Sequence, residues 1–210
     1  MYYQYSRSEM KPFFPTLYFN VFEMGCGEGI FSKQLNQDNI QALWGIEPSE
    51  EASKVATENG YKVLTGLYDD CVDNLPDQFF DLVICNDVIE HMVDHDDFLE
   101  QIKKKITVDG VIVGLVPNVR YYKNLRDLLF KRDWEYQDAG VLDRTHLRFF
   151  TERSLKRCFT EHNYEIQKVE GINRARGFKA FIAIMMLLSL FTWGDIKYVQ
   201  FAFRIRKTEQ

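Results

Sequence analysis

Residues 23–29 read Glu-Met-Gly-Cys-Gly-Glu-Gly, and they join an apolar run at 19–24 to a stretch with helical spacing. Glycines at such a junction allow the backbone to turn tightly and let a ligand approach it without a Cβ atom in the way. The spacing is Gly-x-Gly-x-Gly, and Ile30 stands where the dinucleotide fingerprint has its third glycine. The stretch therefore indicates a ligand-binding loop of a parallel α/β sheet that differs from the usual pyrophosphate loop.

Two carboxylates near this loop indicate which ligand it holds. Glu23 lies at the tip of the expected first strand, where it would repel a pyrophosphate and attract an ammonium group. Glu47 ends the expected second strand, about 20 residues after the glycines, where a carboxylate can accept two ribose hydroxyls. A ligand with a ribose, a cationic amino-acid end and no phosphate is S-adenosylmethionine. Taken singly, each of these residues could equally be a turn former or a helix cap.

The first half of the chain alternates short apolar runs with amphipathic stretches, which is the pattern of a parallel sheet covered by helices. Strands are expected at 19–24, 42–47, 61–65, 80–85, 111–116, 164–169 and 198–206. Helices are expected at 28–35, 49–59, 94–106, 151–163 and 180–193. The alternation of apolar residues in 198–206 is typical of a half-covered, edge-type strand.

Three segments resemble the successive motifs of class I S-adenosylmethionine-dependent methyltransferases. They are residues 23–29, Gly45-Ile-Glu-Pro48 and Phe80-Asp-Leu-Val-Ile-Cys-Asn-Asp-Val-Ile-Glu-His91. The resemblance covers about residues 20–117. It implies a doubly wound, seven-stranded, mostly parallel α/β sheet of the Rossmann-like methyltransferase type, with an antiparallel last strand and S-adenosylmethionine as cofactor.

The same resemblance implies roles for individual residues. Glu23 and the backbone of 25–29 would hold the methionine end of the cofactor, Glu47 would hold the ribose, and Asn86 would lie near the sulfonium. Where many members have an acid that meets the adenine amine, this chain has Leu67, so adenine is expected to pack on Leu67 and Tyr68. The expected cofactor-binding residues are Glu23, Gly25, Cys26, Gly27, Glu47, Pro48, Leu67 and Asn86.

Residues 118–150 follow the fifth expected strand and carry more aromatic and hydrogen-bonding side chains than a connection needs. Their start lies at the ligand-binding edge of the sheet. Residues 133–151 also resemble a block in methyltransferases associated with bacterial O-antigen and other surface-polysaccharide synthesis, which implies a sugar or glycan-type hydroxyl as acceptor. The other interpretation of 118–150 is a solvated surface helix followed by salt-bridged packing.

Three side chains are expected to act on the acceptor. His146 and Asp143 lie in the insert, and His146 is the preferred proton acceptor. His91 is the third side chain and a second candidate for proton acceptor, because it follows the fourth strand near the expected sulfonium. His91 and His95 stand four apart beside several acids, but the pattern lacks His-Glu-x-x-His and the acids suit the first turn of a helix. No metal site is therefore expected.

The chain has 210 residues and a net charge of −5, which suits one domain and gives no basic field for nucleic acid. We expect a single methyltransferase domain with four parts. They are a short N-terminal segment (1–19), a cofactor-binding half (20–117), an acceptor-side insert (118–150) and C-terminal helices and strands (151–210). The four cysteines form no paired pattern and no signal peptide is seen, which favours the cytoplasm.

Residues 180–193 are the only candidate for a membrane segment. This stretch has 14 residues, whereas a membrane-spanning helix needs about 20. A buried or subunit-contact helix is preferred, with a homodimer as one outcome, and contact with a membrane surface stays open. Two other functions also stay open. One is a non-catalytic module that binds the same cofactor or a partner. The other is a nicotinamide-dependent oxidoreductase, which the Gly-x-Gly-x-Gly spacing and Glu23 disfavour.

Overall fold

The fold is taken from a computed structural model, which describes residues 7–175 and 179–208. Seven strands form one sheet in the order β3-β2-β1-β4-β5-β7-β6. The strands are β1 (Asn20–Met24), β2 (Ala42–Glu47), β3 (Lys62–Thr65), β4 (Phe80–Asn86), β5 (Ile106–Pro117), β6 (Tyr164–Arg174) and β7 (Tyr198–Lys207). β7 pairs antiparallel with β5 and β6, and the other pairs are parallel. The expected fold class and its antiparallel last strand are confirmed.

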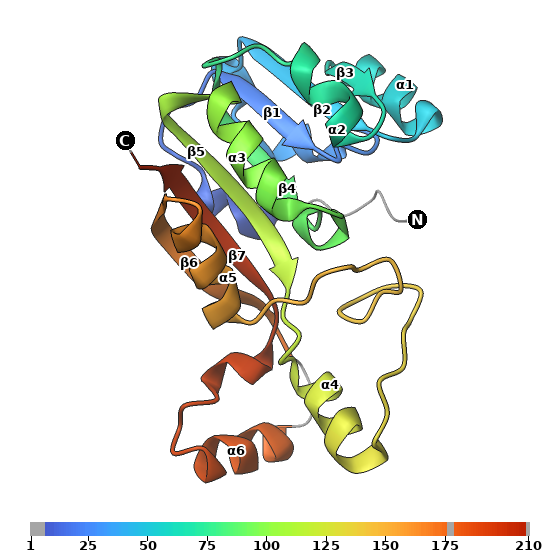
Figure 1. Ribbon diagram of the computed structural model, residues 1–210, viewed down its shortest axis with the longest axis vertical. Helices are drawn as coiled ribbons and strands as arrows, with labels where there is room; N and C mark the ends of the chain where they lie inside the picture. Colours follow the sequence, from blue (N-terminus) through green and yellow to red (C-terminus); the bar gives the residue numbers. More distant parts are fainter. Residues whose placement is uncertain (1–6, 176–178, 209–210) are drawn as a thin grey trace.

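The helices are α1 (Glu50–Glu58), α2 (Tyr68–Cys71), α3 (His95–Lys105), α4 (Tyr122–Arg126), α5 (Glu152–Glu161) and α6 (Lys179–Leu188). Short 3-10 helices lie at Ser8–Phe13, Ile30–Gln34, Gln37–Asn39, Val72–Asn74, Ile89–His91 and Gly194–Lys197, and a π-helical turn follows α4 at Asp127–Lys131. In Figure 1, α3 and α5 lie against the near face of the sheet, whereas α4 and α6 extend away from its lower end.

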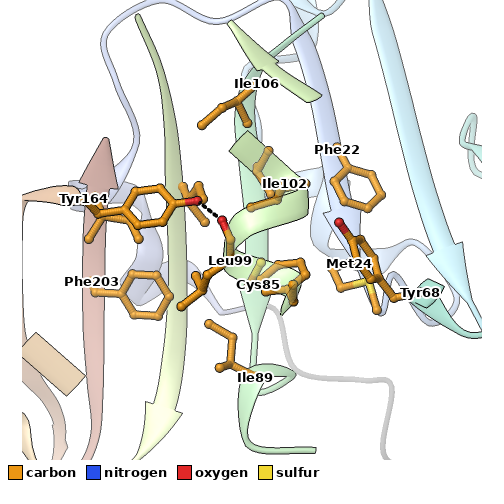
Figure 2. Packing of buried hydrophobic residues seen from close by; sticks show 14 of the residues in the cluster. Phe22, Met24, Tyr68, Cys85, Ile89, Leu99, Ile102, Ile106, Tyr164 and Phe203 are labelled. Carbon is orange, nitrogen blue, oxygen red and sulfur yellow. Dashed lines mark hydrogen bonds between the residues drawn. The ribbon is translucent and has the colours of Figure 1, made fainter. Parts of the chain in front are cut away.

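Apolar side chains are buried on both faces of the sheet. One cluster packs α3 and α5 against the strands, and in it the hydroxyl of Tyr164 donates to the carbonyl of Leu99 at 2.6 Å, which ties β6 to α3 (Figure 2). The second cluster packs Phe13, Phe31 and Ala56 against the other face. The sheet is thus covered on both sides, which leaves its carboxyl edge as the place for a ligand.

Side-chain caps begin the three longest helices of the sheet layers. The Ser49 hydroxyl accepts from the N–H of Ala52 at 3.3 Å, and the Asp94 carboxylate accepts from the N–H of Asp97 at 2.9 Å. Thr151 forms a reciprocal capping box at the start of α5. These caps satisfy N–H groups that an open helix end leaves unpaired, so α1, α3 and α5 begin where the sequence predicts.

The helix expected at 28–35 is shorter than expected and is not an α-helix, because the structure has a 3-10 helix at Ile30–Gln34. Gly29 precedes it with a left-handed φ of 74°, and the Ser32 hydroxyl donates to the Gly29 carbonyl at 2.8 Å. A serine bonded to a nearby carbonyl competes with the regular helical ladder. The glycine loop is therefore followed by little more than one tight turn.

The strand expected at 198–206 is present as β7, but its expected edge position is wrong, because β7 lies between β5 and β6. The N-terminal segment covers its more polar face, where the Arg204 guanidinium donates to the Phe14 carbonyl at 3.4 Å and Ala202 is fully buried. A polar side chain in a strand can thus point toward a neighbouring segment and bond to its backbone, and it need not point into water. The edge strand on this side of the sheet is β6.

The apolar stretch 180–193 forms a shorter helix than expected and is not buried. α6 ends at Leu188, and three of its apolar side chains, Ile184, Leu187 and Leu188, are exposed. Within residues 7–175 and 179–208, no helix has the length and apolar character to cross a membrane. The buried-helix interpretation is therefore wrong.

Candidate active site

The carboxyl ends of β1, β2 and β4 open into a cavity of about 670 Å³, which we call the first cavity. Its volume falls in the range of sites that hold a small ligand. All the expected cofactor-binding residues line it, namely Glu23, Gly25, Cys26, Gly27, Glu47, Pro48, Leu67 and Asn86. Of the three residues expected to act on the acceptor, His91 and Asp143 line it as well. The fold thus brings together residues from five separate stretches of sequence.

In the glycine loop, the N–H groups of residues 25–27 are already engaged. The N–H groups of Gly25 and Cys26 donate to the Ile46 carbonyl at 2.9 and 3.2 Å, and that of Gly27 donates to the Glu47 carboxylate at 2.9 Å. Gly25 and Gly27 adopt left-handed φ angles of 67° and 54°, which a residue with a Cβ atom adopts only with strain. A loop whose donors are used in this way retains carbonyl oxygens for a ligand, and these suit an ammonium group better than a phosphate.

Glu23 is a buried carboxyl at the floor of this cavity and accepts a hydrogen bond from the Tyr61 hydroxyl. Burial, with a smaller contribution from the nearby Glu47 carboxylate, raises the pKa of Glu23 to about 8, although the hydrogen bond from Tyr61 acts in the opposite direction. A cationic group bound beside Glu23 would favour the ionised form and lower this pKa. The position therefore fits the amino group of an amino-acid ligand.

Glu47 is held rigidly at the end of β2. One carboxylate oxygen accepts from the N–H of Gly27, and the other accepts from the N–H of Ser49 at 3.0 Å. Each carboxylate oxygen has a second lone pair, so both can accept a further hydrogen bond. A fixed carboxylate with two remaining acceptor positions fits the two hydroxyls of a ribose.

Asn86, the last residue of β4, carries a buried amide whose oxygen and nitrogen have no hydrogen-bond partner among residues 7–175 and 179–208. Buried polar groups are nearly always paired, because an unpaired one costs about 1–3 kcal/mol. Since Asn86 lines the first cavity, a polar ligand can supply the missing partners. This unpaired amide shows that the residues present fit a bound small molecule.

The opposite end of the cavity is lined by Leu67, Tyr68 and Asp69. Leu67 is exposed, and the buried Tyr68 hydroxyl lacks a partner in the described part of the chain. Asp69 is a carboxylate that the sequence-based expectation missed, because that expectation looked for the acid at Leu67. Asp69 stands two residues after Leu67, in the first turn of α2.

Comparison with known proteins decides the family. The family described as a methyltransferase domain matches residues 6–169. The chain belongs to this family. S-adenosylmethionine is the methyl donor that membership implies, in agreement with the sequence.

Individual relatives of this methyltransferase domain are distant. A ubiquinone biosynthesis O-methyltransferase of Rickettsia bellii is 25% identical over 158 residues, which cover 72% of this chain and 64% of the relative, so the match spans less than two thirds of that protein. A mitochondrial arginine hydroxylase of Rattus norvegicus is 29% identical over 94 residues, covering 45% of this chain and 27% of that protein. A structure of a methyltransferase from Archaeoglobus fulgidus matches the fold with a TM-score of 0.70 at 18% identity, covering 98% of this chain and 96% of that one.

His146 lies beside the first cavity, at the edge of another one. It lines a second cavity of about 660 Å³, which it shares with Arg7, Asp87, Asn173 and Gln200. Arg7 and Asp87 line both cavities. Their ion pair therefore forms part of the wall between the two cavities.

The insert of this methyltransferase domain is joined to the turn after β4. The N–H groups of Leu147 and Arg148 donate to the Glu90 carbonyl at 2.8 and 3.1 Å. The rings of His91 and His146 meet edge to face, with their centroids 4.7 Å apart. The insert thus brings His146 next to His91.

His146 and Glu90 form a buried pair. The Nδ1 atom of His146 lies 3.1 Å from the Val141 carbonyl, and its Nε2 atom lies 4.0 Å from a Glu90 carboxyl oxygen. Neither carboxyl oxygen of Glu90 has a hydrogen-bond partner among the residues described. Burial, reinforced by Asp87, raises the pKa of Glu90 well above its usual value, and burial lowers the pKa of His146. Both shifts favour the neutral forms.

Asp143 supports this pair through a turn. Its carboxylate accepts from the N–H and the hydroxyl of Thr145 at 2.8 and 2.6 Å. Burial acts against ionisation, but the hydrogen bonds from Thr145 outweigh it and lower the pKa of Asp143 below its usual value. An ionised Asp143 therefore fixes the turn on which His146 stands.

Two groups of side chains have the composition of metal sites. The first joins Glu90, His91 and His146, and the second joins His95, Asp96 and Cys158; within each group the ligand atoms lie within 4.8 Å of one another. His91 and His95, which are close in sequence, fall into different groups. The four-residue spacing of His91 and His95 therefore does not bring them into one group.

Replacing Asn86 by Ala is expected to weaken S-adenosylmethionine binding about tenfold and to leave the Tm unchanged or slightly higher. The reason is that the Asn86 amide bonds to nothing in the described chain, so only the ligand loses a partner. Calorimetry and thermal unfolding measure the two quantities. Asn74→Ala, at an exposed asparagine outside the cavity, is the control. Loss of several degrees in Tm with unchanged affinity would show that Asn86 serves the fold instead.

Proposed function

We propose that this domain transfers a methyl group from S-adenosylmethionine to a hydroxyl of a small acceptor, a sugar or glycan of the kind used in surface-polysaccharide synthesis. The observation that carries the proposal is the pair of adjoining cavities. The first is lined by every residue expected to bind the cofactor, and the second is lined by His146. Transfer between two ligands requires such neighbouring sites.

The first cavity would hold the cofactor. Glu23 would pair with the amino group of the cofactor, and Glu47 would accept hydrogen bonds from the two ribose hydroxyls. The Asn86 amide would find in the ligand the hydrogen-bond partners that the described chain does not provide. When bound there, S-adenosylmethionine supplies a methyl carbon already activated by the sulfonium. What remains for the protein is to orient the acceptor, exclude water and take up a proton.

His146 is the proposed proton acceptor. Its lowered pKa keeps the ring neutral near pH 7, as a base must be, and the Val141 carbonyl orients the ring. The proton taken from the acceptor hydroxyl would stay on the ring beside Glu90. His91, which lines the first cavity, is the alternative base. Asp143, expected among the catalytic residues, is proposed to position His146, because its carboxylate is already bonded to Thr145.

The lining of the second cavity supports a polyhydroxylated acceptor. Its polar groups form a chain in which Asn173 donates to Gln200 at 2.7 Å and Gln200 donates to Asp87 at 2.6 Å. Such paired donors and acceptors can exchange partners with sugar hydroxyls. The Rickettsia bellii relative is named an O-methyltransferase, which supports oxygen as the methylated atom. We further propose a cytoplasmic location, which the four buried, unpaired cysteines support.

Two measurements test the function. In calorimetry we expect binding of S-adenosylmethionine and none of NAD; the reverse result would establish a nicotinamide enzyme and overturn the proposal. Mass spectrometry of reactions with nucleotide sugars and lipid-linked glycans should then find a product heavier by one methylene. Cofactor binding without transfer to any of these acceptors would favour the non-catalytic binding module and contradict the glycan acceptor.

A further inference from the structure

Large apolar side chains gather on the part of the molecule formed by α4, the π-helical turn after it and α6, which extends away from the sheet in Figure 1. Eight of them are between 45% and 83% exposed. We call this set the apolar tip, and its members are Leu128, Leu129, Phe130, Ile184, Leu187, Leu188, Leu190 and Phe191. Contiguous exposed apolar surface of this kind marks an interaction site in a folded domain.

The two helices that carry the tip are joined to each other. Phe181 of α6 packs edge to face on Phe130 with ring centroids 6.1 Å apart, and it also contacts Tyr122 of α4 with centroids 6.4 Å apart. Ile184, Leu187 and Leu188, three or four residues apart, share the outward face of α6. Packing within the described chain thus uses the Phe181 side of α6 and leaves this face in solvent.

The backbone at the end of α6 also directs apolar side chains outward. Leu190 and Phe191 have left-handed φ angles of 52° and 65°, which large apolar residues rarely adopt. Both side chains remain highly exposed in this conformation, at 83% and 70%. The strained turn therefore does not serve burial in the core.

The charges around the tip favour one kind of partner. The segment 122–135 beside the tip has a net charge of +1 in a chain whose net charge is −5, from the bases Lys123, Arg126, Lys131 and Arg132 and the acids Asp127, Asp133 and Glu135. Arg126 and Lys131 both form ion pairs with Asp127. Residues 180–194 carry no charged side chain. A second copy would bring an identical basic rim against this one, whereas an anionic lipid surface offers opposite charge. An apolar face with a basic rim is also the pattern of helices that lie in a membrane interface.

We propose that the apolar tip docks this domain on the surface of an anionic lipid bilayer. The apolar side chains enter the boundary between headgroups and acyl chains, and the basic residues meet lipid phosphates. This contact is superficial, since within the described residues no helix is long and apolar enough to span. The proposal is independent of the acceptor, because it rests on a surface outside both cavities.

Flotation with vesicles of phosphatidylcholine and phosphatidylglycerol, mixed 7:3, tests the proposal, with pure phosphatidylcholine for comparison. We expect the wild-type protein to bind the mixed vesicles at least about tenfold better, and to be released by salt. The double variant Leu188→Glu/Phe191→Glu and the double variant Lys131→Glu/Arg132→Glu should each bind the mixed vesicles at least about tenfold less well.

The matched control is Leu17→Glu/Val108→Glu, which changes two exposed apolar residues outside the tip and should leave vesicle binding unchanged. Thermal unfolding of each variant shows whether the fold survives. Failure of the wild type to bind the mixed vesicles overturns the proposal. So does equal loss of binding in the control. A dimer in light scattering that Leu188→Glu/Phe191→Glu dissociates, without vesicle binding, would show that the tip is a subunit interface.

Discussion

Replacing Glu47 by Ala should raise the Kd for S-adenosylmethionine about 100-fold. Two hydrogen bonds from ribose hydroxyls to a carboxylate contribute about 3 kcal/mol in total, which corresponds to roughly a factor of 100. The same change removes the acceptor for the N–H groups of Gly27 and Ser49, so the glycine loop loses its attachment to β2. Calorimetry with the purified variant measures the effect.

A second ligand separates contact with the ribose from collapse of the loop. The wild-type protein should bind a 2′-deoxy analogue of the cofactor more weakly than the cofactor itself, whereas Glu47→Ala should barely distinguish the two. Glu51→Ala, an exposed acid on the neighbouring helix, is the matched control and should bind normally. If the variant still discriminates fully between the two ligands, Glu47 does not hold the ribose.

Replacing His146 by Gln should lower kcat by about 10²- to 10⁴-fold, the usual effect of losing a general base. Burial lowers the pKa of His146, so the wild-type ring is neutral at pH 7 and gains a proton only below its ordinary titration range. Wild-type kcat/KM should therefore be constant near pH 7 and fall as the pH drops through this lowered pKa. We call this fall the acidic limb of the pH–rate profile. The variant should lack the acidic limb, and a pH–rate profile of both proteins measures it.

Two further histidines make this prediction specific. His91→Gln tests the alternative base, since a loss of the acidic limb in that variant alone would transfer the role to His91. His162→Gln changes a histidine at the end of α5, whose Nδ1 atom lies 2.8 Å from the Cys158 carbonyl, and it should retain normal turnover. Normal activity in His146→Gln at all pH values would contradict the assignment.

Much of the cofactor half could be predicted because its signals are local. Strands β2 and β4 are short, largely apolar segments followed by polar residues, and this change in character marks the positions of Glu47 and Asn86. The caps Ser49 and Thr151 mark helix starts by a side-chain bond to an N–H three residues later. Such features need no knowledge of distant parts of the chain.

Parts of the site that depend on distant contacts could not be predicted. Arg7 reaches Asp87 across 80 positions, and the Glu90 carbonyl receives the insert at Leu147. Nothing in the spacing of these residues signals their meeting, because packing of the insert and the N-terminal segment creates it. The same holds for α6, since an apolar composition suits a buried helix and an exposed one equally.

Cells contain many adenosine compounds that carry phosphates, and these share the ribose that Glu47 would recognise. A phosphate reaching the glycine loop would meet the N–H groups of 25–27 already bonded to β2, and the Glu23 carboxyl beside them. The helix behind the loop, Ile30–Gln34, is too short to provide the positive end of a helix dipole. We therefore expect discrimination against abundant nucleotides to lie at their phosphate end, because their adenosine end is the same as that of the methyl donor.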